Sequence, residues 1–146
     1  MMASTTQLNT PGRALAELGA VHALTDVTGF GLLGHLLEMC RGAKLAAELR
    51  FADLPLIAEA VACVKQGVAT GASARNWKSY GDSVCLQNID DWQQKLLTDP
   101  QTSGGLLVAC APEAVGGVMD EFTQRGFGDA RVIGRMVDGK AGVTVS

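Results

Sequence analysis

Apolar residues along the chain follow two rhythms, one typical of helices and one typical of strands. The clearest helical pattern is Leu33, Leu36, Leu37 and Cys40, which predicts a helix over residues 30–41 with one buried face. Similar spacing, together with flanking Gly, Pro and capping residues, predicts the other helices. The complete set of predicted helices spans residues 11–18, 30–41, 56–66, 90–97 and 112–125.

Two of these helices carry specific expectations about their ends and faces. Thr10 is the expected cap of the first helix, and Pro11 suits its first position because proline lacks a backbone N–H. In the third helix we expect Ile57, Val61 and Val64 to face inward, because they share one side of a helix.

The strand rhythm is clearest in residues 45–51, where alternate residues from Leu45 to Phe51 share one apolar face. Asp138-Gly139 lies between the last two predicted strands and is a common turn of β-hairpins, so we expect those strands to pair with each other. The predicted strands span residues 21–27, 45–51, 106–110, 131–137 and 141–145.

The order of these elements predicts one α/β (α+β) domain with a mixed β-sheet packed with helices. Residues 1–9 are interpreted as a tail or linker, and residues 10–146 as the domain. Residues 68–89 lack apolar periodicity and are rich in Gly, Ser and Asn, so they are predicted as a long polar connection with room for a short helix over residues 74–78.

The amino-acid composition and net charge of the chain limit the classes of protein to which it can belong. The chain has 146 residues, of which 47% are hydrophobic and 18% charged, which excludes a disordered chain. Its net charge is −3 and no basic cluster is present, so neither nucleic acid nor an anionic membrane surface is an expected partner. No apolar run approaches the roughly 20 residues of a membrane-spanning helix, and no signal peptide is visible, so we expect a cytoplasmic protein.

The four cysteines give no sign of a metal site or a nucleophile. They are widely separated and form no C-x-x-C pair, and no neighbouring histidine supports ligation. Cys40, Cys63 and Cys110 lie in apolar sequence and are expected to be small buried hydrophobes, whereas Cys85 has more polar neighbours.

The first candidate site is a polar, Gly-rich turn between a predicted strand and a predicted helix. This first turn comprises residues 25–31, Thr25-Asp26-Val27-Thr28-Gly29-Phe30-Gly31. It places a carboxylate at the end of a strand and free N–H groups at a helix start, an arrangement that suits a metal–phosphate complex.

The polar residues and the glycines of the first turn each have two interpretations that the sequence leaves open. Asp26 serves either as a metal ligand or as a simple turn cap. The hydroxyls of Thr25 and Thr28 bond either phosphate or nearby backbone, and Gly29 and Gly31 either expose N–H groups to phosphate or permit a positive φ. His35, one helical turn further on, is expected to be a buried or half-buried helix histidine, with proton transfer or ligation as the alternative.

The second candidate site is the second turn, residues 99–105. It reads Asp99-Pro100-Gln101-Thr102-Ser103-Gly104-Gly105 and leads directly into a predicted strand. Its Asp-Pro pair is expected to stop the preceding helix. Thr102, Ser103 and Gly104 either line a cleft or form a turn that feeds the strand, and both interpretations stay open.

Together the two turns resemble the C-terminal half of the selenophosphate synthetase (selenide, water dikinase) family, within the superfamily of aminoimidazole ribonucleotide (AIR) synthetase. Asn9-Thr10-Pro11-Gly12 also fits that family, and the resemblance runs from roughly Thr5 to the C-terminus. It implies an enzyme of two α/β domains, with MgATP bound mainly on the N-terminal domain in a cleft that faces the C-terminal one. The implied reaction converts ATP, selenide and water to selenophosphate, AMP and phosphate, and Asp26 corresponds to the C-terminal domain's ligand to magnesium.

The resemblance also implies that much of the enzyme lies elsewhere. The family's catalytic Cys or selenocysteine, a nearby Lys and the other magnesium-binding aspartates belong to the N-terminal half and have no counterpart here. We therefore expect a detached C-terminal domain without catalytic residues of its own, inactive alone and unable to bind Mg²⁺ or ATP tightly. Its expected partners are the N-terminal ATP-binding domain and, in the complete enzyme, a second copy in a homodimer; an exposed apolar surface should promote self-association.

Two alternatives remain open at this point. The chain is a stand-alone binding or regulatory module that docks on a complete synthetase, or it belongs to a purine or thiamine branch of the same superfamily. The second turn argues against the latter, because its sequence resembles the selenium branch specifically.

Overall fold

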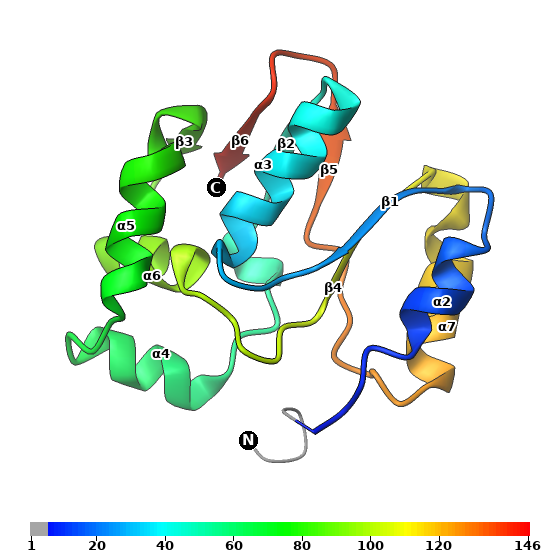
Figure 1. Ribbon diagram of the computed structural model, residues 1–146, viewed down its shortest axis with the longest axis horizontal. Helices are drawn as coiled ribbons and strands as arrows, with labels where there is room; N and C mark the ends of the chain where they lie inside the picture. The colour runs from blue at the N-terminus through cyan, green and yellow to red at the C-terminus, as the bar shows by residue number, and fades with distance from the viewer. Residues whose placement is uncertain (1–5) are drawn as a thin grey trace.

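The computed structural model describes residues 6–146 and divides the strands between two sheets (Figure 1). An antiparallel ribbon pairs β1 (Val21–Asp26) with β4 (Leu106–Cys110). A second, mixed sheet has the strand order β3-β6-β2-β5. Its strands are β3 (Val84–Leu86), β6 (Gly142–Val145), β2 (Ala46–Leu49) and β5 (Gly134–Val137).

Helices pack around both sheets. Figure 1 shows α2 and α7 side by side on one side of the ribbon, and the remaining helices and the four-stranded sheet on the other side. The helices are α2 (Pro11–Ala16), α3 (Gly31–Ala43), α4 (Ala58–Lys65), α5 (Gly71–Tyr80), α6 (Asp91–Thr98) and α7 (Val115–Gln124). The short 3₁₀ helices are η1 (Phe51–Asp53), η2 (Gly81–Ser83) and η3 (Pro112–Ala114).

The ribbon separates two apolar clusters because side chains alternate along its strands. In β4, Leu106 and Val108 pack on the small cluster of Leu15, Val118 and Phe122 between α2 and α7. Leu107, between those two β4 residues, belongs to the larger cluster on the opposite side. The ribbon is thereby fixed from both faces, which gives its end a defined position.

Helix α3 forms the centre of the larger cluster, as its apolar spacing predicts. Leu33, Leu37 and Cys40 are fully buried, and Leu36 nearly so. The helix ends where Lys44 adopts a left-handed conformation with φ 57°. The predicted mixed α/β fold class is confirmed, and the difference is that the strands form two sheets.

The predicted hairpin between the last two strands is wrong. β2 lies between β5 and β6, antiparallel to β5 and parallel to β6. Asp138-Gly139 does lie in the connection between β5 and β6, but both of these strands pair with β2 and not with each other. A hairpin signal describes only the local turn, so it cannot reveal a third strand that inserts from earlier in the chain.

The predicted long polar connection is also wrong over much of residues 68–89, where the structure has α5, η2 and β3. The side of α5 that faces the protein carries Ser73, Asn76 and Tyr80, all buried. A helix whose buried face is mostly polar shows no apolar periodicity, so the sequence pattern suggests a loop.

Smaller differences concern helix ends and faces. Thr10 makes no side-chain capping bond, and the helix that follows it ends at Ala16. Of the residues expected to face inward from α4, only Val64 is buried, and Ile57 is 49% exposed. Cys63, expected to be buried, is exposed on the same helix.

The N-terminal boundary and the membrane expectation complete the picture of the fold. Residues 1–5 of the predicted tail lie outside the described part, whereas Gln7 and Asn9 already hydrogen-bond to the domain. The domain boundary at residue 10 therefore stays a prediction. Within residues 6–146 no helix combines the length and the apolar character needed to cross a bilayer.

Candidate functional site

The two Gly-rich turns lie side by side at one end of the β1–β4 ribbon. The Val27 N–H donates to the Gly105 carbonyl at 2.9 Å, and the Gln101 N–H donates to the Thr28 carbonyl at 3.0 Å. Strand pairing up to Asp26 and Leu106 brings the turns together, because one turn leaves β1 where the other enters β4. The structure thus joins two segments that are about seventy residues apart in sequence.

Gly104 marks the closest approach of the two turns. A β-carbon at this position would lie 1.8 Å from the Val27 carbonyl oxygen, so no side chain fits. The Gly104 carbonyl accepts a hydrogen bond from the side-chain amide of Asn9 at 2.9 Å. Close packing therefore accounts for a glycine here, and its predicted contact with a cofactor stays a prediction.

The two glycines of the first turn differ in their surroundings. Gly31 has φ +68°, and a β-carbon there would lie 2.7 Å from the Thr98 carbonyl carbon, so the start of α3 packs directly on the end of α6. Gly29 is exposed and has open space around its α-carbon. Of the two, only Gly29 has free space beside it in which an anion would fit.

Asp26 lies exposed at the end of β1, as its position in the sequence predicts. No ion pair among residues 6–146 involves its carboxylate. The described residues also contain no group of three or more His, Cys, Asp or Glu side chains that could hold a metal ion. Asp26 therefore fits a magnesium ion as one oxygen ligand and does not form a complete metal site within this chain.

The polar side chains of the turns divide into bonded and exposed ones. The Thr25 hydroxyl donates to the Asp26 carbonyl at 3.1 Å, which matches the backbone interpretation of this residue. The Thr28 hydroxyl lies 3.1 Å from Nε2 of His35, a contact that the sequence did not reveal. Thr102 and Ser103 are exposed on the second turn, where they are accessible to a ligand.

His35 is buried, as expected, and connects α3 to the first turn through Thr28. Its other nitrogen, Nδ1, lies 3.3 Å from a carboxylate oxygen of Glu38, yet the angle does not allow a hydrogen bond. The Phe30 ring covers the imidazole with 5.7 Å between ring centroids. The histidine thus contacts the first turn through Thr28 and is shielded from solvent.

Helix α5 holds the first turn through hydrogen bonds that sequence analysis missed. Asn76 donates hydrogen bonds to the carbonyls of Gly29 and Thr98, and the Tyr80 hydroxyl donates to the Phe30 carbonyl at 2.6 Å. Burial raises the pKa of Tyr80 to about 12. No local motif could have identified these residues, because their partners are backbone carbonyls 22 to 50 positions away.

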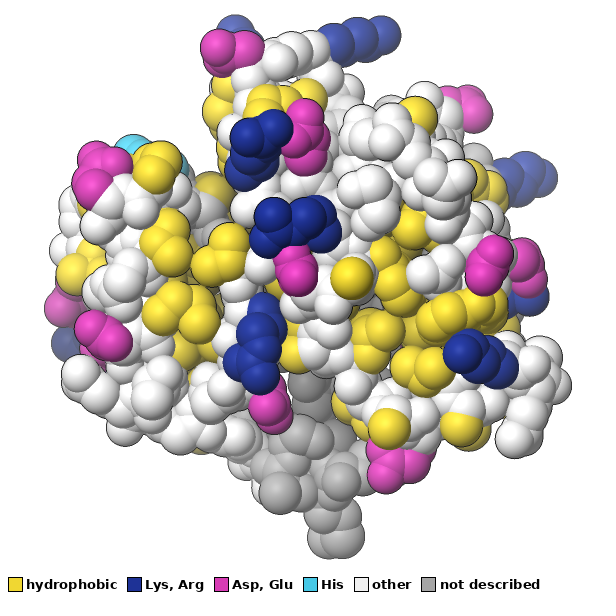
Figure 2. Space-filling model, turned by 180° about the vertical axis from the view of Figure 1, so that it is seen from behind, with side chains coloured by type: hydrophobic (Ala, Val, Ile, Leu, Met, Phe, Trp, Pro, Cys, Tyr) yellow, Lys and Arg dark blue, Asp and Glu magenta, His cyan; other side chains and the backbone are white. Residues whose placement is uncertain are grey.

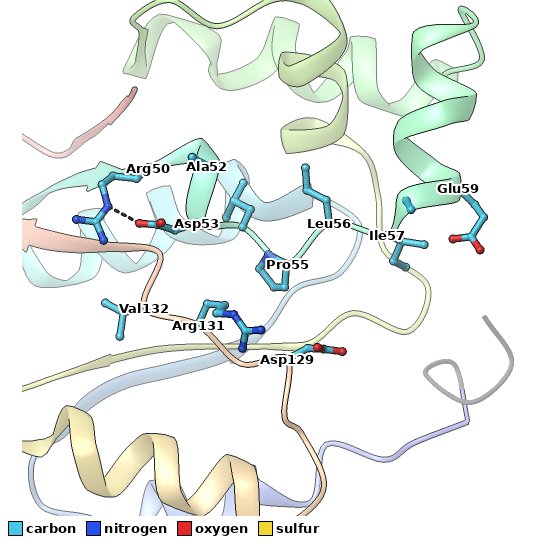
Figure 3. A pocket seen from close by; sticks show the side chains of 12 residues that line it. Arg50, Ala52, Asp53, Pro55, Leu56, Ile57, Glu59, Asp129, Arg131 and Val132 are labelled. Atoms are coloured by element: carbon cyan, nitrogen blue, oxygen red, sulfur yellow. Dashed lines mark hydrogen bonds and ion pairs between the residues drawn. The ribbon is translucent and has the colours of Figure 1, made fainter.

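A groove of about 680 Å³ lies apart from the turns. Figure 3 shows residues 50–59 on one side of it and residues 129–132 on the other, with an ion pair between Arg50 and Asp53. None of the predicted site residues lines this groove. Figure 2 shows basic and acidic side chains interspersed with apolar ones over the rear face, without an extended basic patch.

Comparison with known proteins points to one family. The sequence model described as "AIR synthase related protein, C-terminal domain" matches residues 4–146. The selenide, water dikinase of Burkholderia pseudomallei is 60% identical over the whole chain, and those of Dechloromonas aromatica and Rhizobium meliloti are 53% and 50% identical over 99% of it. The chain spans only about 42% of the length of these curated relatives.

Solved structures share the fold at lower identity. E. coli HypE superposes over 97% of this chain and 36% of its own, with a TM-score of 0.63 and 19% identity. Thiamine-monophosphate kinase from Stenotrophomonas maltophilia covers 86% of this chain and 31% of its own, with a TM-score of 0.54 and 22% identity. These likenesses concern the fold alone.

Proposed function

Because the chain belongs to the family of AIR synthase related proteins, as their C-terminal domain, we propose that it acts as the C-terminal domain of a selenide, water dikinase. The observation that carries the proposal is the pairing of the two turns, which presents Asp26, Gly29 and the tip of the second turn together at one end of the ribbon. Identities of 50–60% with dikinases over nearly the whole chain support the same assignment.

In this proposal the chain forms one face of a MgATP cleft, and the N-terminal domain forms the other. Asp26 supplies one carboxylate oxygen to magnesium, while the exposed N–H groups near Gly29 and the hydroxyls of Thr102 and Ser103 contact phosphate oxygens. Bound magnesium would neutralise the charge of the polyphosphate. The role of this chain is therefore to bind and orient, and the residues that react with selenide belong to the N-terminal domain.

Two alternative functions are a purine or thiamine branch of the superfamily and a stand-alone module that docks on a complete synthetase. The relatives of high identity are selenide, water dikinases, which favours the selenium branch over a purine or thiamine branch. The likeness to thiamine-monophosphate kinase, at 22% identity, concerns the fold alone. A stand-alone module that docks on a complete synthetase would change the rate of that synthetase without replacing any part of it. We also propose that the complete enzyme is a homodimer in the cytoplasm.

The test measures AMP release from ATP in the presence of selenide and Mg²⁺. The chain alone should release none, and the chain mixed with the separately produced N-terminal part of the Burkholderia pseudomallei relative should restore activity. Asp26→Asn should abolish the restored activity. Turnover by the chain alone would contradict the proposal, as would a mixture that stays inactive although sedimentation shows that the two parts associate.

A further inference from the structure

Asn76 bonds the first Gly-rich turn and the end of α6, which leads into the second turn, with one side-chain nitrogen. It lies on α5 and is 9% exposed, and its Nδ2 donates to the Gly29 carbonyl at 2.9 Å and to the Thr98 carbonyl at 3.0 Å. Gly29 belongs to the first turn, and Thr98 immediately precedes the second. A single planar amide therefore connects the first turn to the residue from which the second turn begins.

Other side chains on α5 strengthen the same connection. The Ser73 and Thr98 hydroxyls lie 2.7 Å apart, and the Thr70 hydroxyl donates to the Asp99 carboxylate at 2.8 Å. Four side chains between Thr70 and Tyr80 thus bond to the two Gly-rich turns or to Thr98, which precedes the second turn. Helix α5 lies beside α6 and also contacts α3, so it reaches the C-terminal end of one and the N-terminal end of the other (Figure 1).

A side-chain amide suits the chemistry of this position. Both partners are backbone carbonyls, which only accept hydrogen bonds, so the residue between them must provide two donors. An aspartate of the same shape would present an oxygen to the two carbonyls, and a serine would supply only one donor. The Thr98 carbonyl is buried, so it cannot turn to water without moving its own segment if it loses this partner.

We propose that Asn76 is a positioning residue that sets the spacing between the first and second turns. It does not touch the ligand; it fixes the Gly29 and Thr98 carbonyls and so fixes where Asp26 and the tip of the second turn lie relative to each other. Only the consequence for nucleotide binding rests on the proposed function, because the spacing itself is a property of the isolated chain.

The first test measures amide hydrogen exchange by NMR on the chain alone, with Asn76→Asp as the variant. The N–H groups of Val27 and Gln101, which bond across the two turns, should exchange about tenfold faster, while those of Arg50 and Gln87 at the four-stranded sheet should change by less than about twofold. Ser79→Ala is the matched control, because its hydroxyl bonds only the Asn76 carbonyl on the same helix. The proposal would be overturned if exchange became equally faster at all of these amides, or if the exchange rates of Val27 and Gln101 did not change.

Asn76→Ser provides a second route if the aspartate variant does not fold. It removes one of the two donors in a smaller side chain and should give the same localised acceleration at Val27 and Gln101. If the serine variant folds and its turn amides exchange as in the original chain, Asn76 does not set the spacing.

The second test separates positioning from general stability through kinetics. In the active mixture with the N-terminal part, Asn76→Asp should raise KM for ATP about tenfold and leave kcat within about threefold. Unchanged KM together with locally accelerated exchange would overturn the link to the site. An inactive mixture with the original chain would instead contradict the proposed function, and the exchange result would still decide the role of Asn76.

Discussion

The backbone N–H of Val27 donates to the carbonyl of Gly105 at 2.9 Å, one position beyond the last paired residues of β1 and β4. The strand ladder therefore continues into both Gly-rich turns. Because the ribbon is packed on both faces, its position determines where the turns lie. A change in one turn should consequently disturb the other.

Gly104→Ala should destabilise the chain, because its β-carbon would lie 1.8 Å from the Val27 carbonyl oxygen and force the turns apart. We expect a loss of about 2–3 kcal/mol in the free energy of unfolding, measured by urea denaturation. Gly105→Ala is the matched control, because a β-carbon added at this position would have no atom within 4 Å. This change should alter the free energy of unfolding by less than about 0.5 kcal/mol. Equal effects of the two changes would contradict the described packing.

Tyr80 should ionise at unusually high pH, because burial raises its pKa from 10.0 to about 12. It is the single tyrosine of the chain, so the ultraviolet absorbance of tyrosinate reports on it alone. Between pH 10 and about 12 the unfolded state has lost this proton and the folded state retains it, so stability falls as pH rises through this window.

Tyr80→Phe separates that effect from other groups that titrate in alkali. The variant should lose the part of the pH dependence that Tyr80 causes, and at neutral pH it should be less stable by about 1–3 kcal/mol because the Phe30 carbonyl loses its donor. A tyrosine titration midpoint near 10 would show that the hydroxyl is not buried against the first turn.

Thr28→Val should destabilise the first turn, because the buried ring of His35 would lose the hydrogen bond at Nε2 while Nδ1 already has none. We expect a loss of about 1–3 kcal/mol by thermal or urea unfolding. Thr25→Val serves as control, because that hydroxyl bonds only the adjacent Asp26 carbonyl, and its effect should stay below about 1 kcal/mol. The reverse order of the two losses would refute the role assigned to the Thr28–His35 contact.

Self-association at high protein concentration stays a prediction, and sedimentation equilibrium can test it. Ile57 and Val132 are 49% and 47% exposed and line the same groove, so burying them in a second molecule would be favourable. The double variant Ile57→Ser, Val132→Thr should shift the equilibrium towards monomer. A monomeric original chain at millimolar concentration would contradict the expectation.

Sequence patterns predicted the parts of the fold in which a local rule and the tertiary environment agree. In α3, apolar spacing coincides with the buried face. The helix predicted over residues 90–97 matches α6, and it ends before Pro100 as the Asp-Pro pair predicts. The two turns were likewise identifiable, because the first lies between a predicted strand and a predicted helix, and the second lies between a predicted helix and a predicted strand.

The remaining parts depend on contacts distant in sequence. α5 is held by carbonyls of other segments, so its buried Ser73 and Asn76 resemble loop residues. The hairpin signal at Asp138-Gly139 could not reveal that β2 inserts between the flanking strands. The exposed place of Asp26 at the end of β1 was predictable from the sequence, and its role as a metal ligand stays a prediction. The hydrogen bonds of Asn9 and Asn76 to the turns were visible only in the folded chain.

The most direct test of the proposed function replaces the matching part of the Burkholderia pseudomallei dikinase with this chain and measures AMP release with selenide and Mg²⁺. The chimera should be active, and Asp26→Asn should reduce its activity by at least about a hundredfold without changing its thermal stability. Asp138→Asn, a change at an exposed aspartate remote from the turns, should leave activity unchanged. A fully active Asp26→Asn chimera would contradict the assignment of the two turns as one face of the MgATP cleft.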